Sequence, residues 1–298
     1  MSHTHSSLDT AVGFGVYVEH LVEHGSSEEK EILSVPPHVH LGGGAYNIAR
    51  TLSVLGMTPT VYGVCGNMHG PTRAALDALV SESEIPVTLL PVRERTASSY
   101  YVMDTARQSV LGVGDPGGNI LITDEAQKTI LESSATIRIL AEINSESLAL
   151  AQVFFSVSGG VKVLIPSLEL MKSSDGRAFI DGVDILSLNE IEAEEYSQKT
   201  INAHTVETFP QPIVFLTRGG ESAYLKLEGA VYEALPPHCE GVVYPNGAGD
   251  SATAALVYAL YTADMKPQEA LEYALSIGTK VCQTHKPYLE SYAWKIHS

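Results

Sequence analysis

The sequence predicts an α/β fold: a doubly wound, mostly parallel sheet with helices on both faces and a small β-sheet lid. From Thr123 onwards, short apolar runs alternate with amphipathic segments, which is the pattern of right-handed βαβ units. Two irregular β-rich regions, at about 19–41 and 96–115, lie outside that alternation and suit a flap over one edge of the sheet. We therefore expect a flexible tail at residues 1–10 and one domain over residues 11–298 that carries the lid.

The expected elements follow in chain order from the local pattern of apolar residues. Residues 11–18, AVGFGVYV, are apolar and predict a buried strand, whereas residues 23–37 suit an exposed strand and turn. A helix after the glycine-rich residues 42–44 places Ile48 and Leu52 on one face and ends at Gly56. Later strands are expected at 60–65, 98–104, 108–113, 136–143, 161–166, 183–188 and 212–217, with a hairpin over 222–234. Later helices are expected at 71–83, from the capping residue Thr123 onwards, and at 145–154, 168–180, 189–198, 248–263 and 267–285.

The composition excludes several classes of partner. The chain has 298 residues, and its 18 Lys and Arg against 35 Asp and Glu give a formal net charge of −17. So acidic a chain disfavours a nucleic acid or an anionic membrane as partner, although backbone amides can still hold a small phosphate ligand. Cys65, Cys239 and Cys282 are too few for a disulfide framework, so we expect a reducing cytoplasm. No apolar run approaches the ~20 residues needed to span a bilayer.

The strongest local motif is NGAGDSATAALVYAL, residues 246–260. Gly247, Ala248 and Gly249 stand directly before an apolar helix, whose first N–H groups would stabilise an anion. Asp250 lies in the same turn, where a carboxylate can accept the proton of a hydroxyl that attacks a phosphate. The alternative is that Asp250 only caps a helix after a glycine-rich turn.

Two weaker motifs accompany it. In LGGGAYNIA, residues 41–49, Gly42 and Gly43 followed by Asn47 would bring backbone and one amide against a polyol, although such turns are also common without a ligand. Asn189 and Glu192, in NEIE at the end of a strand, could hold water around Mg²⁺. A solvated acidic helix face explains NEIE equally well. The Walker, dinucleotide-binding and G-x-S-x-G signatures are absent.

Together these motifs resemble the ribokinase-like (PfkB) family of carbohydrate and nucleoside kinases. LGGGAYNIARTLSVLG is similar to the family's G-G-x-x-x-N-x-A signature, and PNGAGDSATAAL is similar to its G-A-G-D signature. NEIE resembles the family's N-x-x-E, and LTRGG at residues 216–220 resembles its T-x-G nucleotide motif. All four occur in the family's order over residues 42–250, so the resemblance covers most of the chain.

The resemblance implies ATP-dependent phosphorylation of a primary hydroxyl on a sugar or nucleoside, with Mg²⁺ as cofactor. Asp250 would be the base, with an anion hole formed by the amides of Gly247, Ala248 and Gly249. The remaining implied contacts are Asn189 and Glu192 for Mg²⁺, Thr217 and Gly219 for ATP, and Gly42, Gly43 and Asn47 for the substrate. The lid would close over the substrate to exclude water. Two copies of the chain could also form a homodimer through their lids.

Three departures from the family pattern bear on the ligands, and the second of them, at Tyr244 and Pro245, bears on the monovalent-cation site of some members. Glu19 stands where the family usually has a substrate-gripping Asp, and Tyr244 and Pro245 stand where it has Asp-Thr. EINSESLALA and IPSLELMK are similar to the pseudouridine kinase branch, but Tyr46 stands where that branch usually has Arg. A pseudouridine-like nucleoside is therefore one candidate substrate. The alternatives are a free-sugar kinase, such as a ribokinase or fructokinase, and a catalytically weak, ligand-binding member of the family.

Overall fold

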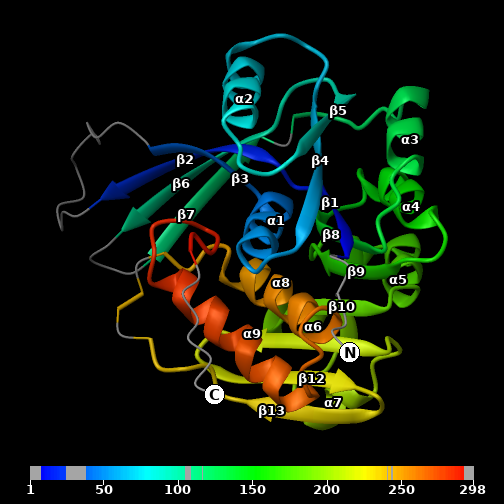
Figure 1. Cartoon of the computed structure of the whole chain (residues 1–298), viewed down its shortest axis with the longest axis vertical. Coiled ribbons are helices and arrows are strands. Elements are labelled where there is room, and N and C mark those ends of the chain that lie inside the picture. Colours follow the sequence, from blue (N-terminus) through cyan, green and yellow to red (C-terminus); the bar gives the residue numbers. More distant parts are fainter. Residues whose placement is uncertain are drawn as a thin grey trace, which may run out of the picture.

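A computed structural model describes residues 8–24, 38–104, 109–115, 117–239, 241–242 and 244–291. These residues form a nine-stranded sheet flanked by helices and a separate four-stranded sheet that projects from it (Figure 1). The doubly wound architecture and the small second sheet are as the sequence predicts. None of the helices in these ranges is long and apolar enough to cross a membrane.

The large sheet has the strand order β13-β12-β11-β10-β9-β8-β1-β4-β5. Its strands are β1 (Asp9–Phe14), β4 (Thr58–Gly66), β5 (Val87–Arg93), β8 (Ile137–Ile143), β9 (Val161–Pro166), β10 (Ile185–Asn189), β11 (Ile213–Arg218), β12 (Glu221–Leu227) and β13 (Ala230–Ala234). All pairings from β5 to β11 are parallel, whereas β12 pairs antiparallel with both β11 and β13. Parallel pairing brings the carboxyl ends of these strands to one edge, where ligands collect in such sheets.

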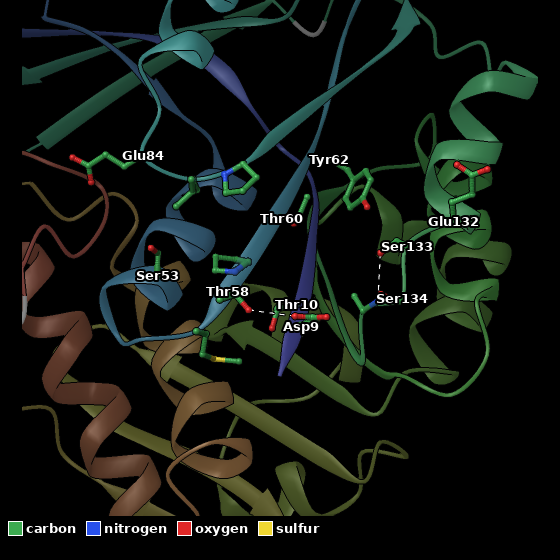
Figure 2. A pocket seen from close by; sticks show the side chains of 15 residues that line it. Asp9, Thr10, Ser53, Thr58, Thr60, Tyr62, Glu84, Glu132, Ser133 and Ser134 are labelled. Carbon is green, nitrogen blue, oxygen red and sulfur yellow. Dashed lines mark hydrogen bonds between the residues drawn. The ribbon is translucent and has the colours of Figure 1, made fainter. Parts of the chain in front are cut away.

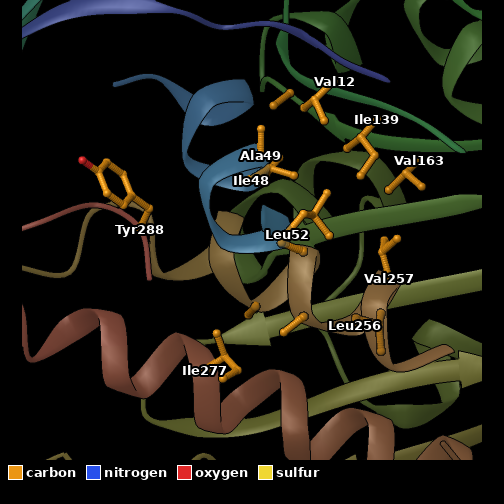
Figure 3. Close-up of a cluster of buried hydrophobic side chains, with 14 of the residues drawn as sticks. Val12, Ile48, Ala49, Leu52, Ile139, Val163, Leu256, Val257, Ile277 and Tyr288 are labelled. Carbon is orange, nitrogen blue, oxygen red and sulfur yellow. The ribbon is translucent and has the colours of Figure 1, made fainter. Parts of the chain in front are cut away.

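Side chains alternate between the two faces of the sheet, so each strand contributes to two cores. In β11, Ile213 and Phe215 face one core, whereas Val214 and Leu216 face the other. The first core is covered by α1 (Gly44–Val54), α2 (Pro71–Ser81), α8 (Ala248–Tyr261) and α9 (Pro267–Cys282), as Figure 3 shows for α1, α8 and α9. The second is covered by α3 (Asp124–Leu131), α4 (Leu148–Ser156), η1 (Leu170–Lys172), α5 (Ser174–Asp181), α6 (Glu190–Ser197) and α7 (Ala203–Glu207).

The small sheet, which we call the lid, has the order β3-β2-β6-β7. Its strands are β2 (Tyr17–His24), β3 (His38–Gly42), β6 (Ser98–Asp104) and β7 (Ser109–Asp115). Strand β3 leads directly into the glycine-rich turn before α1. The lid is therefore joined to the carboxyl edge of the large sheet.

Several expected boundaries differ from the structure. The single strand expected at 11–18 is wrong, because β1 ends at Phe14 and β2 begins the lid at Tyr17. Strand β1 also begins at Asp9, so the last two residues of the expected tail belong to the sheet, while residues 1–7 lie outside the described residues. Most of the exposed strand and turn expected at 23–37 also lies outside them. The expected cap of α3 is confirmed, since Thr123 Oγ1 accepts the amide of Ala126 at 3.1 Å.

Candidate active site

The turn before α8 presents bare backbone to a large cavity. Gly247 is the N-cap of α8, has φ 77°, and offers no side-chain acceptor to the first-turn amides. A Cβ on Gly247 would lie 1.8 Å from the carbonyl oxygen of Pro287, so only glycine fits there. The first N–H groups of a helix carry partial positive charge, so this turn is suited to an anion.

Asp250 sits in the first turn of α8 and meets α1. Its Oδ2 accepts a hydrogen bond from Asn47 Nδ2 at 3.0 Å, which joins two motifs that lie 203 residues apart. The side chain also lines the cavity. Asp250 therefore has a hydrogen-bond partner on another helix, α1. A residue that only caps α8 would not need such a partner.

The glycine-rich turn before α1 is held by two carboxylates. Glu19 Oε1 accepts the amide of Gly43 at 2.9 Å, and Glu142 Oε2 accepts the amide of Gly44 at 3.2 Å. A Cβ on Gly42 would lie 2.1 Å from the carboxyl carbon of Glu19, which explains glycine at that position. Glu19 is only 1% exposed, with His40 Nε2 at 3.2 Å from its Oε2. The structure thus places Glu19 on lid strand β2 with its carboxylate buried against the turn, rather than in open solvent.

Glu142 is a site residue that the sequence analysis missed. It follows the apolar core of β8 at the carboxyl edge, has φ 58°, and lines the cavity beside Tyr17. The available signal was a lone carboxylate near the end of an otherwise apolar strand, which also fits an ordinary strand end. A positive φ at a non-glycine residue is costly and is often kept at functional sites.

Asp250 and Glu142 have raised pKa values. Desolvation raises the pKa of Asp250 to about 6, against the lowering effect of the Asn47 hydrogen bond, and Glu19 raises it further. Desolvation, followed by the charge of Asp250, raises the pKa of Glu142 to about 7. A carboxylate whose pKa lies near neutrality is suited to exchange protons at physiological pH.

We expect the pH profile of catalysis to report this shift. If Asp250 must be ionised, kcat/KM falls as pH drops through about 6, because the carboxylate is then protonated in the free enzyme. Steady-state rates between pH 5 and pH 8 in constant ionic strength measure the acidic limb. An acidic limb centred near pH 4, where an exposed Asp titrates, would contradict this assignment.

The other end of the same cavity is lined by the expected nucleotide and metal residues. The cavity has a volume of about 1220 Å³ and is bordered by Asn189, Glu192, Thr217 and Gly219 as well as by Asp250. Its walls at that end include apolar side chains from the loop after β13 and from α9: Leu235, Pro236, Val242, Leu275 and Cys282. Ligand pockets have this mixture of apolar wall and a few polar groups.

Asn189 and Glu192 form a reciprocal capping box at the start of α6. Asn189 Oδ1 accepts the amide of Glu192 at 2.9 Å, and Glu192 Oε2 accepts the amide of Asn189 at 2.8 Å. Burial raises the pKa of Glu192, and the charge of Asp250 adds to that shift. Within the described residues no three His, Cys, Asp or Glu side chains gather as metal ligands. One carboxylate in such a cleft nevertheless fits Mg²⁺, which keeps several waters and takes phosphate oxygens as ligands.

A smaller cavity of about 480 Å³ lies at the opposite, amino-terminal edge of the sheet (Figure 2). Its lining includes the starts of β1 and β4 and none of the candidate site residues. Two of its carboxylates already have cationic partners, since Glu84 pairs with Arg50 and Glu132 with Lys128. The motifs therefore assign the chemistry to the larger cavity.

Comparison with known proteins agrees with this geometry. The family described as pfkB family carbohydrate kinase matches residues 17–292. Phosphofructokinase-2 from Escherichia coli, in complex with potassium, has TM-score 0.76 at 18% identity over 95% of each chain. A Burkholderia thailandensis nucleoside kinase in complex with inosine has TM-score 0.73 at 18% identity, over 95% of this chain and 92% of that one. A putative ribokinase from Agrobacterium tumefaciens has TM-score 0.75 at 16% identity, over 94% of this chain and 93% of that one. No curated protein matches the chain.

Proposed function

The chain belongs to the pfkB family of carbohydrate kinases, whose members phosphorylate sugar or nucleoside hydroxyls, and we propose that it transfers the γ-phosphoryl group of ATP to a primary hydroxyl. A pseudouridine-like ribonucleoside is the leading acceptor, on the sequence similarity of residues 142–151 and 165–172 to that branch. The observation that carries the proposal is the position of Asp250. It stands in one cavity between the glycine-rich turn and the strand ends that carry Thr217 and Asn189.

In this proposal Asp250 is the general base and the turn before α8 is the anion hole. Phosphoryl transfer depends mainly on positioning and on charge stabilisation, yet the attacking hydroxyl must lose its proton. The amides of Gly247, Ala248 and Gly249 lie at the positive end of α8, next to the carboxylate. Asn47 holds that carboxylate in place through its 3.0 Å hydrogen bond.

The acceptor would be held by Gly42, Gly43, Asn47 and Glu19, with Glu142 beside them. Within the described part of the chain, Asn47 Oδ1 is buried and lacks a hydrogen-bond partner. Buried polar atoms are nearly always satisfied, so this oxygen, on the side chain that contacts Asp250, supports a polar ligand there. Because Glu19 and Asn47 are almost fully covered, the lid has to move before an acceptor reaches them.

ATP would lie at the far end of the cavity, with Thr217 and Gly219 at its edge. Glu192, oriented by Asn189, would hold Mg²⁺ through water, and the bound ion would neutralise charge on the transferring phosphate. Free Cys65, Cys239 and Cys282 support our placement of the protein in a reducing cytoplasm. Val39 and Tyr100 are 45% and 49% exposed on the lid, which supports a homodimer formed through that sheet.

A panel of acceptors tests the proposed function. Pseudouridine, uridine, inosine, ribose and fructose are each incubated with ATP and Mg²⁺, and the phosphorylated product is identified by mass spectrometry. We expect the nucleosides to be phosphorylated faster than the free sugars. Faster turnover of ribose or fructose would favour the free-sugar kinase. Thermal stabilisation by a ligand without product from any acceptor would favour a binding protein.

Replacing Glu19 tests its role toward the acceptor. A deoxy analogue that lacks one contacted hydroxyl leaves a desolvated carboxylate underpaired, which costs about 1–3 kcal/mol, or at least ~10-fold in kcat/KM. Glu19→Gln should shrink this discrimination, because neutral amide hydrogen bonds are weaker than charge-assisted ones. The measurement compares both enzymes on the best acceptor and its deoxy analogue. Equal discrimination would assign Glu19 only to holding Gly43.

Replacing Glu192 tests the metal site. Glu192→Gln should raise the Mg²⁺ concentration needed for half-maximal rate without changing the KM of the acceptor. The amide can still accept from Asn189, so the capping box and α6 should persist. Glu195→Gln on the same helix, outside the cavity lining, is the matched control. An unchanged Mg²⁺ requirement in Glu192→Gln would assign NEIE to helix capping alone.

A further inference from the structure

A buried histidine faces Glu19 from the neighbouring strand of the lid. The antiparallel pairing of β2 with β3 sets Glu19 directly opposite His40. His40 is only 8% exposed, and its Nε2 lies 3.2 Å from Oε2 of Glu19, within ion-pair distance. Neither atom has a hydrogen bond to another group in the described part of the chain. The two side chains are therefore each other's polar partner at these atoms.

The carboxylate of Glu19 is held between His40 and the glycine-rich turn. Its Oε1 accepts the amide of Gly43 at 2.9 Å, while its Oε2 faces His40. A Cβ on Gly42 would lie 2.1 Å from the carboxyl carbon, so the group lies flat against the turn. A carboxylate has about four lone-pair sites, so each oxygen can still accept a hydrogen bond from a ligand. Two contacts thus orient Glu19 without using up its capacity to bind hydroxyl groups.

His40 also offsets charge in a crowded group of acids. The charge of Glu19 contributes to the raised pKa values of Asp250 and Glu142, so the three carboxyl groups lie close enough to repel one another. The contact with His40 is attractive only when Nε2 carries a proton, and a protonated ring also compensates one negative charge.

Loss of His40 would therefore change the state of Glu19. Removing one partner of a buried ionic contact leaves an uncompensated charge, which is costly in a site shielded from water. The carboxylate must then turn away from the other acids or take up a proton. Either response removes a fixed, charged hydrogen-bond acceptor from the glycine-rich turn.

We propose that His40 is a positioning residue for acceptor binding, which by pairing with Glu19 holds that carboxylate on the glycine-rich turn, where it accepts hydrogen bonds from hydroxyl groups of the acceptor. This inference rests on the proposed function for the role of Glu19 toward the acceptor. His40 does not line the large cavity, and it acts only through Glu19. Its effect should therefore fall on the acceptor and not on ATP.

His40→Phe tests the proposal, with His38→Phe as the matched control. Phenylalanine keeps a flat ring and removes the nitrogen that faces Glu19, whereas His38, two residues earlier in β3, is exposed. We expect the KM of the best acceptor to rise about 10–100-fold in His40→Phe, the usual loss when a buried charged group loses its partner. Its kcat and its KM for ATP should stay near wild type, because uniform acceptor binding is what is removed. His40→Gln, which keeps an N–H donor, should recover part of the loss, and it carries the test if His40→Phe does not fold.

A double variant and a second readout separate this role from a structural one. Glu19→Gln/His40→Phe should have the same acceptor KM as Glu19→Gln alone, because His40 acts through the charge of Glu19. Amide hydrogen exchange over residues 42–47, measured without ligands, should speed up in His40→Phe but not in His38→Phe, since Glu19 holds the amide of Gly43.

Two results would overturn the proposal in an active enzyme. One is an acceptor KM and an exchange rate in His40→Phe equal to those in His38→Phe. The other is an acceptor KM in the double variant that rises by the full effects of both single changes, which would mean that His40 acts independently of Glu19. Faster exchange in His40→Phe, combined with a wild-type enzyme that phosphorylates no acceptor, would instead overturn the proposed function.

Discussion

Asp250→Asn is expected to lower the rate of phosphoryl transfer by about 10²–10⁴-fold, the usual span for a general base, while acceptor binding persists. Asparagine can still accept the hydrogen bond from Asn47, so the contact between α1 and α8 should survive. It cannot take the proton of the attacking hydroxyl. Single-turnover rates with saturating ATP and acceptor measure the effect on chemistry separately from binding.

Asp175→Asn is the matched control for this variant. Asp175 also stands in the first turn of a helix, α5, but outside the lining of the large cavity. It should retain the wild-type rate. A near-native rate in Asp250→Asn would instead mean that Asp250 only shapes the start of α8.

Asp250→Asn should lower the rate of catalysis but raise the stability of the folded protein at neutral pH. The native pKa of Asp250, about 6, lies above its ordinary value of 3.8, so the folded state binds this proton more tightly than the unfolded chain. The free energy of unfolding from this group therefore falls as pH rises from about 4 to about 6. Asp250→Asn should accordingly be more stable than wild type at pH 7, and the difference should vanish at pH 3.

Gly247→Ala is expected to have the second large effect. A Cβ at this position would lie 1.8 Å from the carbonyl oxygen of Pro287. Because this atom belongs to the backbone and not to a flexible side chain, it cannot rotate away from the added methyl group. The turn must shift, which displaces the amides of the anion hole. Loss of one such donor costs about 10²–10³-fold in kcat, and we expect a fall of at least that size.

Gly229→Ala separates the clash from the backbone strain. Gly229 has φ 78°, nearly the value of 77° at Gly247, but a Cβ there would meet nothing within 4 Å. The left-handed conformation alone should cost each variant roughly 1–2 kcal/mol of unfolding free energy. Urea unfolding of both proteins measures the difference. Equal stability and equal rates for the two variants would contradict the close packing of Gly247 on Pro287.

Much of the fold could be predicted because local patterns and tertiary packing agree. The βαβ alternation after Thr123 is confirmed from β8 to β11, where apolar strands alternate with helices that cover one face of the sheet. Two elements had no usable pattern. Strand β5 contains Pro91 in its interior, which normally argues against a strand, and α7 has only five residues, too few to show a helical period.

The boundary between β1 and the lid could not be predicted for a different reason. AVGFGVYV is uniformly apolar, and both the buried strand and the underside of the lid favour such residues. The chain changes sheets at Gly15, where a Cβ would lie 2.4 Å from Glu142 Oε2. That constraint comes from a residue 127 positions away, in β8, and leaves no trace in the local pattern.

In the candidate site, too, the residue types could be predicted from the sequence, but the contacts between distant segments could not. The residue types in the two glycine-rich motifs indicate anion and polyol chemistry, but the hydrogen bond between Asn47 and Asp250 is a property of the assembled helices. Glu142 was missed because a single carboxylate at a strand end carries no specific signal.

The most direct test of the account follows the γ-phosphate of labelled ATP in the presence of the best acceptor from the panel. The account predicts equal amounts of ADP and labelled, phosphorylated acceptor from the wild-type enzyme, and almost no labelled acceptor from Asp250→Asn. Label that appears only as inorganic phosphate, or transfer to the acceptor at an unchanged rate in Asp250→Asn, would contradict it.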